Sequence, residues 1–168
     1  MLEEGLFFFA CLLAGIGALG RAWCGVFISG RKDATLVRKG PYAMCRNPLY
    51  FFSMLGAVGV GMATETLSIP AVVLLMYAIY YPIVIRSEEK YLAERFGEDF
   101  DTYCHEVPCF FPRFSLLRGN EPGDYPVCTR TLRHNLFDTL WFVWLVGLIE
   151  LLSALQDVGW LPVWWTLY

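Results

Sequence analysis

The sequence predicts an all-α fold, an integral membrane helical bundle of about four transmembrane helices with a cytoplasmic amphipathic helix and a Pro-rich cap loop. Hydrophobic residues make up 57% of the chain and aromatic residues 17%, which is more apolar than an average soluble domain. Apolar runs long enough to cross a bilayer recur, and the charged residues gather between them. Because 168 residues is an ordinary length for one domain, we expect a single domain over residues 1–168.

Four apolar segments account for the predicted transmembrane helices, at residues 5–29, 48–64, 68–86 and 139–156. At about 1.5 Å of rise per residue, the first is long enough to cross a hydrocarbon core of ~30 Å. It lacks the basic stretch and the small-residue cleavage site of a secretory signal, so we expect it to remain as a helix. The second has a strong start signal, because Asn47 is a good N-cap and Pro48 suits the first helical position.

The positive charges predict the topology. The chain has thirteen lysine and arginine residues, and all except Arg21 lie within residues 31–46 or 86–133. Because lysine and arginine accumulate in cytoplasmic loops, we expect segments 30–47 and 87–135 in the cytoplasm and both termini on the opposite side. The net charge of −3 is small and indicates no nucleic-acid partner.

The second cytoplasmic segment begins with an amphipathic pattern. Between Ser87 and Tyr103, apolar residues recur at helical spacing among many charged ones, as is typical of a helix at a membrane surface. We expect Gly97 to break this helix into two pieces. Residues 106–135 follow and hold four prolines, and a loop of this length in a short chain is either disordered or a cap over something.

Three features inside the predicted membrane helices have structural explanations. Residues Gly15–Gly20 match the dinucleotide fingerprint GxGxxG, but inside a membrane helix such small residues favour close helix packing. We expect Arg21 to extend to the interface, with an inward orientation as the alternative. Glu150 is expected to make an interhelical hydrogen bond or to lie near the outer interface.

The six cysteines include no CxxC pair and therefore indicate neither a disulfide framework nor a zinc ribbon. Cys104, His105 and Cys109 are close in sequence, but their spacing fits no standard zinc site and no fourth ligand is evident. We expect no bound metal.

The strongest candidate site comes from helix geometry. The second and third membrane helices are joined by a tight hairpin at residues 64–66, so the start of one and the end of the other must meet at the same face, about 8–10 Å apart. Arg46 and Asn47 are therefore expected to approach Glu88 and Glu89. Such a group suits a zwitterionic small molecule with an anionic part, and the alternative is a plain interfacial salt bridge.

The motifs at these residues resemble a known family. The stretches LVRKGPYAMCRNPLY, SEEKYLAERFGEDFDTY and EVPCFFP occur in this order between Leu36 and Pro112. They resemble the isoprenylcysteine carboxyl methyltransferase and phospholipid methyltransferase superfamily of membrane enzymes. Asn47 stands where that superfamily usually has histidine, and Cys109 stands where arginine often follows the first proline.

The resemblance implies S-adenosylmethionine bound at the cytoplasmic mouth of the bundle, without a Rossmann domain. It implies that Arg46 and Glu89 are catalytic residues beside the cofactor. It also implies a set of residues at the cofactor site: Leu36, Val37, Tyr42, Asn47, Pro48, Tyr50 and Glu88.

The implied function is methyl transfer from S-adenosylmethionine to a lipid-like or prenylated acceptor that enters from the bilayer. A carboxylate acceptor is favoured because it needs no general base, and Asn47 offers none. A phospholipid amine is the alternative acceptor, for which Glu89 is the nearby candidate to take a proton. A non-catalytic membrane binding or assembly protein that keeps the hairpin is the alternative from another class.

Overall fold

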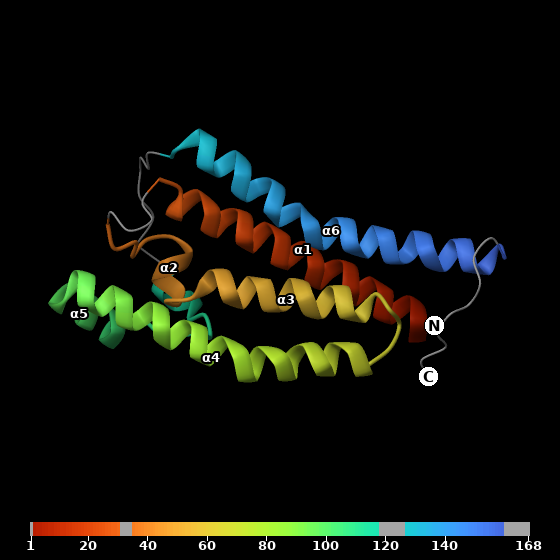
Figure 1. Ribbon diagram of the computed structural model, residues 1–168, viewed down its shortest axis with the longest axis horizontal. Coiled ribbons are helices and arrows are strands. Elements are labelled where there is room, and N and C mark those ends of the chain that lie inside the picture. The colour runs from red at the N-terminus through yellow and green to blue at the C-terminus, as the bar shows by residue number, and fades with distance from the viewer. Residues whose placement is uncertain (1, 31–34, 118–126, 160–168) are drawn as a thin grey trace.

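The computed structural model describes residues 2–30, 35–117 and 127–159, and every regular element in these ranges is a helix. The long helices are α1 (Leu2–Ile28), α3 (Pro48–Met62), α4 (Ser68–Phe96) and α6 (Thr129–Asp157). The short ones are α2 (Pro41–Met44), α5 (Glu98–Glu106) and the 3₁₀ turn η1 (Phe114–Leu117). The long helices lie side by side in the order α6, α1, α3, α4, and the short ones gather at one end of the bundle (Figure 1).

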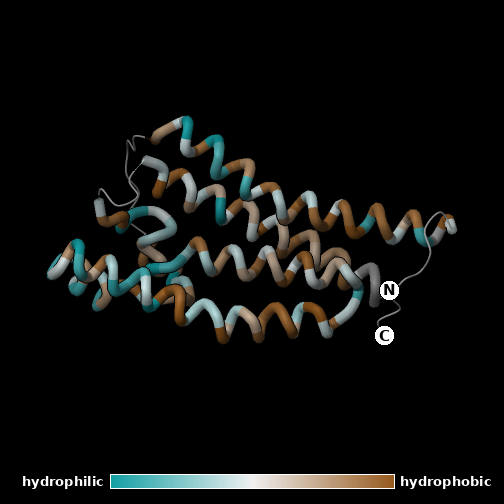
Figure 2. The backbone as a smooth tube through the Cα atoms, viewed as in Figure 1, coloured by the Kyte–Doolittle hydropathy of each residue, from teal (hydrophilic) through white to brown (hydrophobic). Residues whose placement is uncertain are grey.

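This arrangement confirms the predicted all-α membrane bundle. Helices α1, α4 and α6 are long and apolar enough to cross a membrane, and α3 is a shorter apolar helix. With 15 residues and about 1.5 Å of rise per residue, α3 covers roughly 22 Å of a ~30 Å hydrocarbon core. The hydrophilic residues concentrate at the end of the bundle that carries α5 (Figure 2).

Two helices extend beyond the apolar segments that were predicted as membrane helices. Helix α4 does not end at Arg86 but continues without interruption to Phe96, so the first part of the predicted amphipathic helix is its extension. Helix α6 begins at Thr129, well before residue 139. In both places the apolar run marks the part that suits lipid, whereas the helix itself continues through polar residues that contain no helix breaker. The predicted break at Gly97 is present, with φ of 52° between α4 and α5.

Small residues bring α1 and α3 into backbone contact, as the glycine pattern predicted. A Cβ atom on Gly17 would lie 2.5 Å from the backbone nitrogen of Gly56, and one on Gly59 would lie 2.6 Å from that of Ala14. Gly17 belongs to the GxGxxG match, so this motif is used for helix packing.

Arg21 departs from its first expected role, and Glu150 lacks one of the two roles expected of it. The Arg21 guanidinium donates to the Ser53 hydroxyl of α3 and lies 5.7 Å from the Phe142 ring centroid of α6, so it points into the bundle and not to the interface. The reason is that Arg21 is one helical turn from Gly17 and shares the face that packs on α3. Glu150 is exposed on α6 and makes no interhelical hydrogen bond within the described residues. A position near the outer interface, the other role expected for Glu150, stays a prediction.

Candidate active site

The segment from Gly40 to Tyr50 forms the floor of the site. Gly40 adopts a positive φ of 60°, and the buried turn of α2 follows it. The Tyr103 hydroxyl of α5 donates to the Tyr42 carbonyl at 2.6 Å, which ties α5 to this turn. Because α3 starts directly afterwards at Pro48, the polar residues between the two helices are held at the end of the bundle.

The Pro-rich segment lies across this floor through backbone hydrogen bonds. The Arg46 amide donates to the Pro108 carbonyl at 2.9 Å, the Asn47 amide to the Cys109 carbonyl at 3.2 Å, and the Arg113 amide to the Met44 carbonyl at 2.9 Å. These bonds hold residues 107–113 over the start of α3. The part of the expected cap at 118–126 lies outside the described residues.

Arg46 and Glu89 meet as the hairpin geometry predicted. Arg46 Nε lies 2.8 Å from Glu89 Oε1, and the two side chains are 14% and 22% exposed. The other donors of Arg46 extend the contact, because Nη1 reaches the carbonyls of Cys104 at 2.9 Å and Val107 at 3.1 Å. Burial opposes the charged form of Arg46, but the hydrogen bond and charge of Glu89 outweigh it, so the pKa of Arg46 is raised.

Asn47 occupies the N-cap position of α3, but its side chain makes no capping hydrogen bond. Its Nδ2 atom donates instead to Glu89 Oε1 at 3.3 Å and to the Cys109 carbonyl at 3.1 Å. The expected capping by this side chain was therefore wrong. The reason is that a half-buried carboxylate and a half-buried carbonyl compete for the same amide, and an unpaired carboxylate would cost more than an unpaired helix amide.

Cys109 is a site residue that the sequence reasoning missed. Its Sγ atom donates to Glu89 Oε1 at 3.5 Å. Burial and the charge of Glu89 both raise the pKa of the Cys109 thiol, so it stays protonated and remains a donor. The available signal was its position, since it stands where the resembling superfamily often has arginine.

Glu88 has a different partner from its neighbour Glu89. Tyr50 of α3 donates its hydroxyl to Glu88 Oε2 at 2.8 Å. Consecutive residues on a helix point in directions about 100° apart. The carboxylates of Glu88 and Glu89 therefore lie on different sides of the site.

A small cavity of about 100 Å³ lies on the Glu88 side. Five of the seven residues expected at the cofactor site line it, and Arg46 lines it as well; the five are Leu36, Val37, Tyr42, Asn47 and Glu88. Pro48 is buried beneath and Tyr50 reaches the site only through its bond to Glu88. Aromatic residues that were not expected here also contribute, namely Tyr91, Phe96 and Tyr103.

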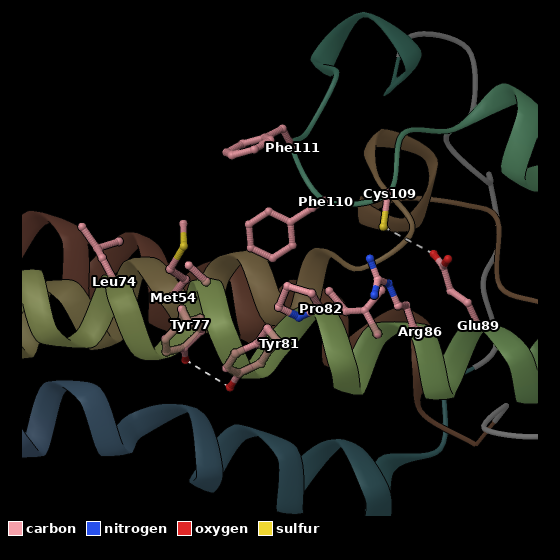
Figure 3. Close-up of a pocket in the computed structure, with 12 residues that line it drawn as sticks. Met54, Leu74, Tyr77, Tyr81, Pro82, Arg86, Glu89, Cys109, Phe110 and Phe111 are labelled. Carbon is pink, nitrogen blue, oxygen red and sulfur yellow. Dashed lines mark hydrogen bonds between the residues drawn. The ribbon is translucent and has the colours of Figure 1, made fainter.

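A large cavity of about 660 Å³ lies on the Glu89 side, between α3, α4 and residues 109–111. Its walls are mostly apolar, and Arg86, Glu89 and Cys109 form a polar end away from Leu74, Met54 and Phe111 (Figure 3). The Tyr81 hydroxyl donates a hydrogen bond to the Tyr77 hydroxyl at 3.2 Å. Arg86, like Cys109, was not among the expected site residues.

The two cavities meet at one pair of side chains. Arg46 lines the small cavity and Glu89 lines the large one, and the two are joined by a 2.8 Å ion pair. Ligands held in both cavities would approach each other across this pair. Within the described part of the chain, no group of three His, Cys, Asp or Glu side chains is placed to hold a metal ion.

The chain is similar to two curated proteins that are named for metal resistance. It is 42% identical over 144 residues to the cobalt-zinc-cadmium resistance protein CzcN of Cupriavidus metallidurans, covering 86% of this chain and 65% of that protein. It is 41% identical over 147 residues to the nickel-cobalt-cadmium resistance protein NccN of Alcaligenes xylosoxydans xylosoxydans, covering 88% and 68%. The chain thus spans about two thirds of the length of these relatives.

The family comparison matches the site region. No solved structure matches the chain. The family model described as phospholipid methyltransferase matches residues 6–99, which include most of α1, the floor of the site, α3, Glu88 and Glu89. The chain belongs to the phospholipid methyltransferase family.

Proposed function

We propose that this protein is a membrane methyltransferase that transfers a methyl group from S-adenosylmethionine to a lipid-like or prenylated acceptor. The observation that carries the proposal is the meeting of two unlike cavities at Arg46 and Glu89. A polar cofactor suits the small cavity, and an acceptor with an apolar tail suits the large one.

The small cavity has polar groups that fit the cofactor. The Tyr42 hydroxyl is buried and has no hydrogen-bond partner among the described residues, although buried polar groups normally have one. The Glu88 carboxylate lies on the same wall and would accept hydrogen bonds from an ammonium group or ribose hydroxyls. At about 100 Å³ the cavity is smaller than the ~300–1,000 Å³ of typical ligand sites, so binding would have to move part of its wall outwards.

The residues at the junction would supply alignment and charge placement. When bound, the cofactor would supply a methyl group on a sulfonium, which an acceptor atom displaces in line. Arg46 would hold a carboxylate near the junction through the donors that it does not spend on Glu89, Cys104 and Val107. The cover formed by residues 107–113 would keep water from the junction, which strengthens these contacts.

The hydrogen bonds that Glu89 already accepts favour a carboxylate acceptor over an amine. A carboxylate oxygen attacks without losing a proton, whereas an amine must release one. Glu89 Oε1 already accepts from Arg46, Asn47 and Cys109, and these donors occupy the oxygen nearest the junction. The family description favours the second candidate, a phospholipid amine, for which Glu89 Oε2 would have to take the proton.

Cofactor binding can be tested by calorimetry on the full chain in detergent. We expect S-adenosylmethionine to bind, and Glu88→Gln to weaken binding roughly tenfold, because a charge-assisted hydrogen bond contributes about 1.5–3 kcal/mol. The matched control is Glu94→Gln on the same helix, an exposed residue outside both cavities. Absence of binding, or equal binding by both variants, would sink the proposal in favour of a non-catalytic membrane protein.

The acceptor can be identified by labelled methyl transfer into a total lipid and membrane-protein extract. Base-labile label on a carboxylate would support the favoured acceptor, and base-stable label on a phospholipid headgroup would support the amine. The names of the two relatives suggest a setting for this experiment, namely membranes from cells exposed to cobalt, zinc, cadmium or nickel.

The orientation in the membrane is also part of the proposal. The end of the bundle with α2 and α5 carries Arg38, Lys39 and Arg46, and the positive-inside rule assigns this end to the cytoplasm. The cofactor would then enter from the cytoplasm and the acceptor from the bilayer.

A further inference from the structure

Arg86 is the charged residue of the large cavity that has no ion-pair or hydrogen-bond partner in the described part of the chain. The charged side chains that line this cavity are Arg86 and Glu89. Glu89 is paired with Arg46 at 2.8 Å, whereas Arg86 makes no ion pair or hydrogen bond with any described residue. Figure 3 shows Arg86 at the same end of the cavity as Glu89 and Cys109.

The polar end of the large cavity therefore has an excess of positive charge. Arg46 neutralises Glu89 from the small-cavity side, so the charge of Arg86 is left over. Arg86 lies three residues before Glu89 on α4, close enough for the pair to meet on one helix face, yet Glu89 Oε1 is held by donors from Arg46, Asn47 and Cys109. Arg86 is exposed, so its guanidinium donors are available to an anion that enters this end of the cavity.

We infer that Arg86 binds the anionic group of the acceptor and so restricts the acceptors to amphiphiles that carry a carboxylate or a phosphate. The planar guanidinium matches both groups through paired hydrogen bonds. The apolar tail would lie along Leu74, Met54 and Phe111. This inference rests on the proposed function in one respect, because it takes the large cavity as the acceptor site.

Binding in the absence of cofactor tests this role directly. The probes are N-acetyl-S-farnesylcysteine with its neutral methyl ester, and farnesyl phosphate with neutral farnesol. They are titrated against the full chain in lipid nanodiscs. We expect at least one anionic probe to bind roughly tenfold or more tightly than its neutral counterpart, as charge-assisted hydrogen bonds imply. The anion with the larger preference identifies the acceptor as a carboxylate or a phosphate amphiphile.

Variants of Arg86 then test whether this residue causes the preference for the anionic probe. Arg86→Gln should abolish the preference for the anionic probe, and Arg86→Lys should keep much of this preference. The control Arg95→Gln changes a residue that is exposed on the same helix outside the large cavity, and it should leave the preference unchanged. The inference is overturned if neither anion is preferred or if Arg86→Gln keeps the preference. S-adenosylmethionine affinity, measured on the same samples, shows separately whether the proposed function fails and whether Arg86→Gln is folded.

Discussion

The two sides of α3 show how one short helix serves two purposes. On the α1 side, glycines bring the backbones into contact, and a Cβ on Gly17 would lie 2.5 Å from a backbone atom of Gly56. On the α4 side, Tyr50 packs edge-on against Tyr81 with ring centroids 5.1 Å apart, and the cavity of about 660 Å³ opens beside them. Small residues close one side into a rigid seam, and large side chains leave room on the other.

This difference separates stability from ligand capacity. In a membrane, helices gain little from the hydrophobic effect and associate mainly by close packing. The α1–α3 seam can therefore hold the frame while the α3–α4 side stays open. Changes at the seam should affect folding, and changes at the large cavity should affect binding.

The largest effect is expected at the seam. Gly17→Ala should lower the stability by about 1–3 kcal/mol, because the added Cβ meets backbone that cannot move aside easily. Gly15→Ala is the matched control on the same helix, where a Cβ would meet nothing within 4 Å, and it should raise stability by up to ~1 kcal/mol through helix propensity. Thermal unfolding in detergent compares the two. Similar shifts of the same sign would contradict the assignment of the seam as the rigid contact.

An intermediate effect is expected in the large cavity. Ala78→Trp places a large ring in the open space and should exclude two or more methylene groups of the acceptor tail. At about 0.8 kcal/mol for each methylene, binding should weaken roughly tenfold or more. The unfolding temperature and the affinity for S-adenosylmethionine should hardly change. The control is Ala71→Trp, exposed on the same helix outside the cavity. Equal acceptor binding by both variants would show that the tail lies elsewhere.

Much of this comparison could be predicted from the sequence because it depends on local signals. The start of α3 at Pro48 follows from the geometry of proline, and the break at Gly97 from the conformational freedom of glycine. The approach of Arg46 to Glu89 follows from the shortness of the hairpin, which leaves the two helix ends no other arrangement. The glycine seam follows from the need of membrane helices for small residues at contacts.

The remaining features depend on partners that are distant in sequence. The side-chain amide of Asn47 could have capped α3 locally, but it donates instead to the half-buried carboxylate of Glu89 on α4 and to the Cys109 carbonyl beyond α5. Arg21 turned inward because Ser53 and Phe142, from two other helices, receive it. Arg86 was predicted to end the third membrane helix because hydropathy falls there, although α4 continues to Phe96. Local patterns cannot reveal which distant groups will compete for a polar side chain.

The smallest effect concerns the chemistry of the thiol at the polar end of the large cavity. Burial and the charge of Glu89 raise the pKa of Cys109, whereas a hydrogen bond from Thr131 lowers the pKa of the exposed Cys128. Because the thiolate is the reactive form, Cys128 should react faster with iodoacetamide near neutral pH. As the pH rises above the pKa of Cys128, the thiolate fraction of Cys128 saturates while that of Cys109 still grows. The ratio of the Cys128 alkylation rate to the Cys109 alkylation rate should therefore fall.

Mass spectrometry of the two cysteine-containing peptides over a pH series measures both rates in one sample. Glu89→Gln removes the neighbouring charge and should shift the alkylation profile of Cys109 to lower pH while leaving that of Cys128 in place. Glu94→Gln, which removes an equal charge from the exposed part of the same helix, should shift neither profile. If Cys109 instead follows the pH profile of Cys128 in the unmodified chain, the polar end of the large cavity is as well hydrated as the protein surface. The residues around Cys109 would then not exclude water from the junction of the two cavities.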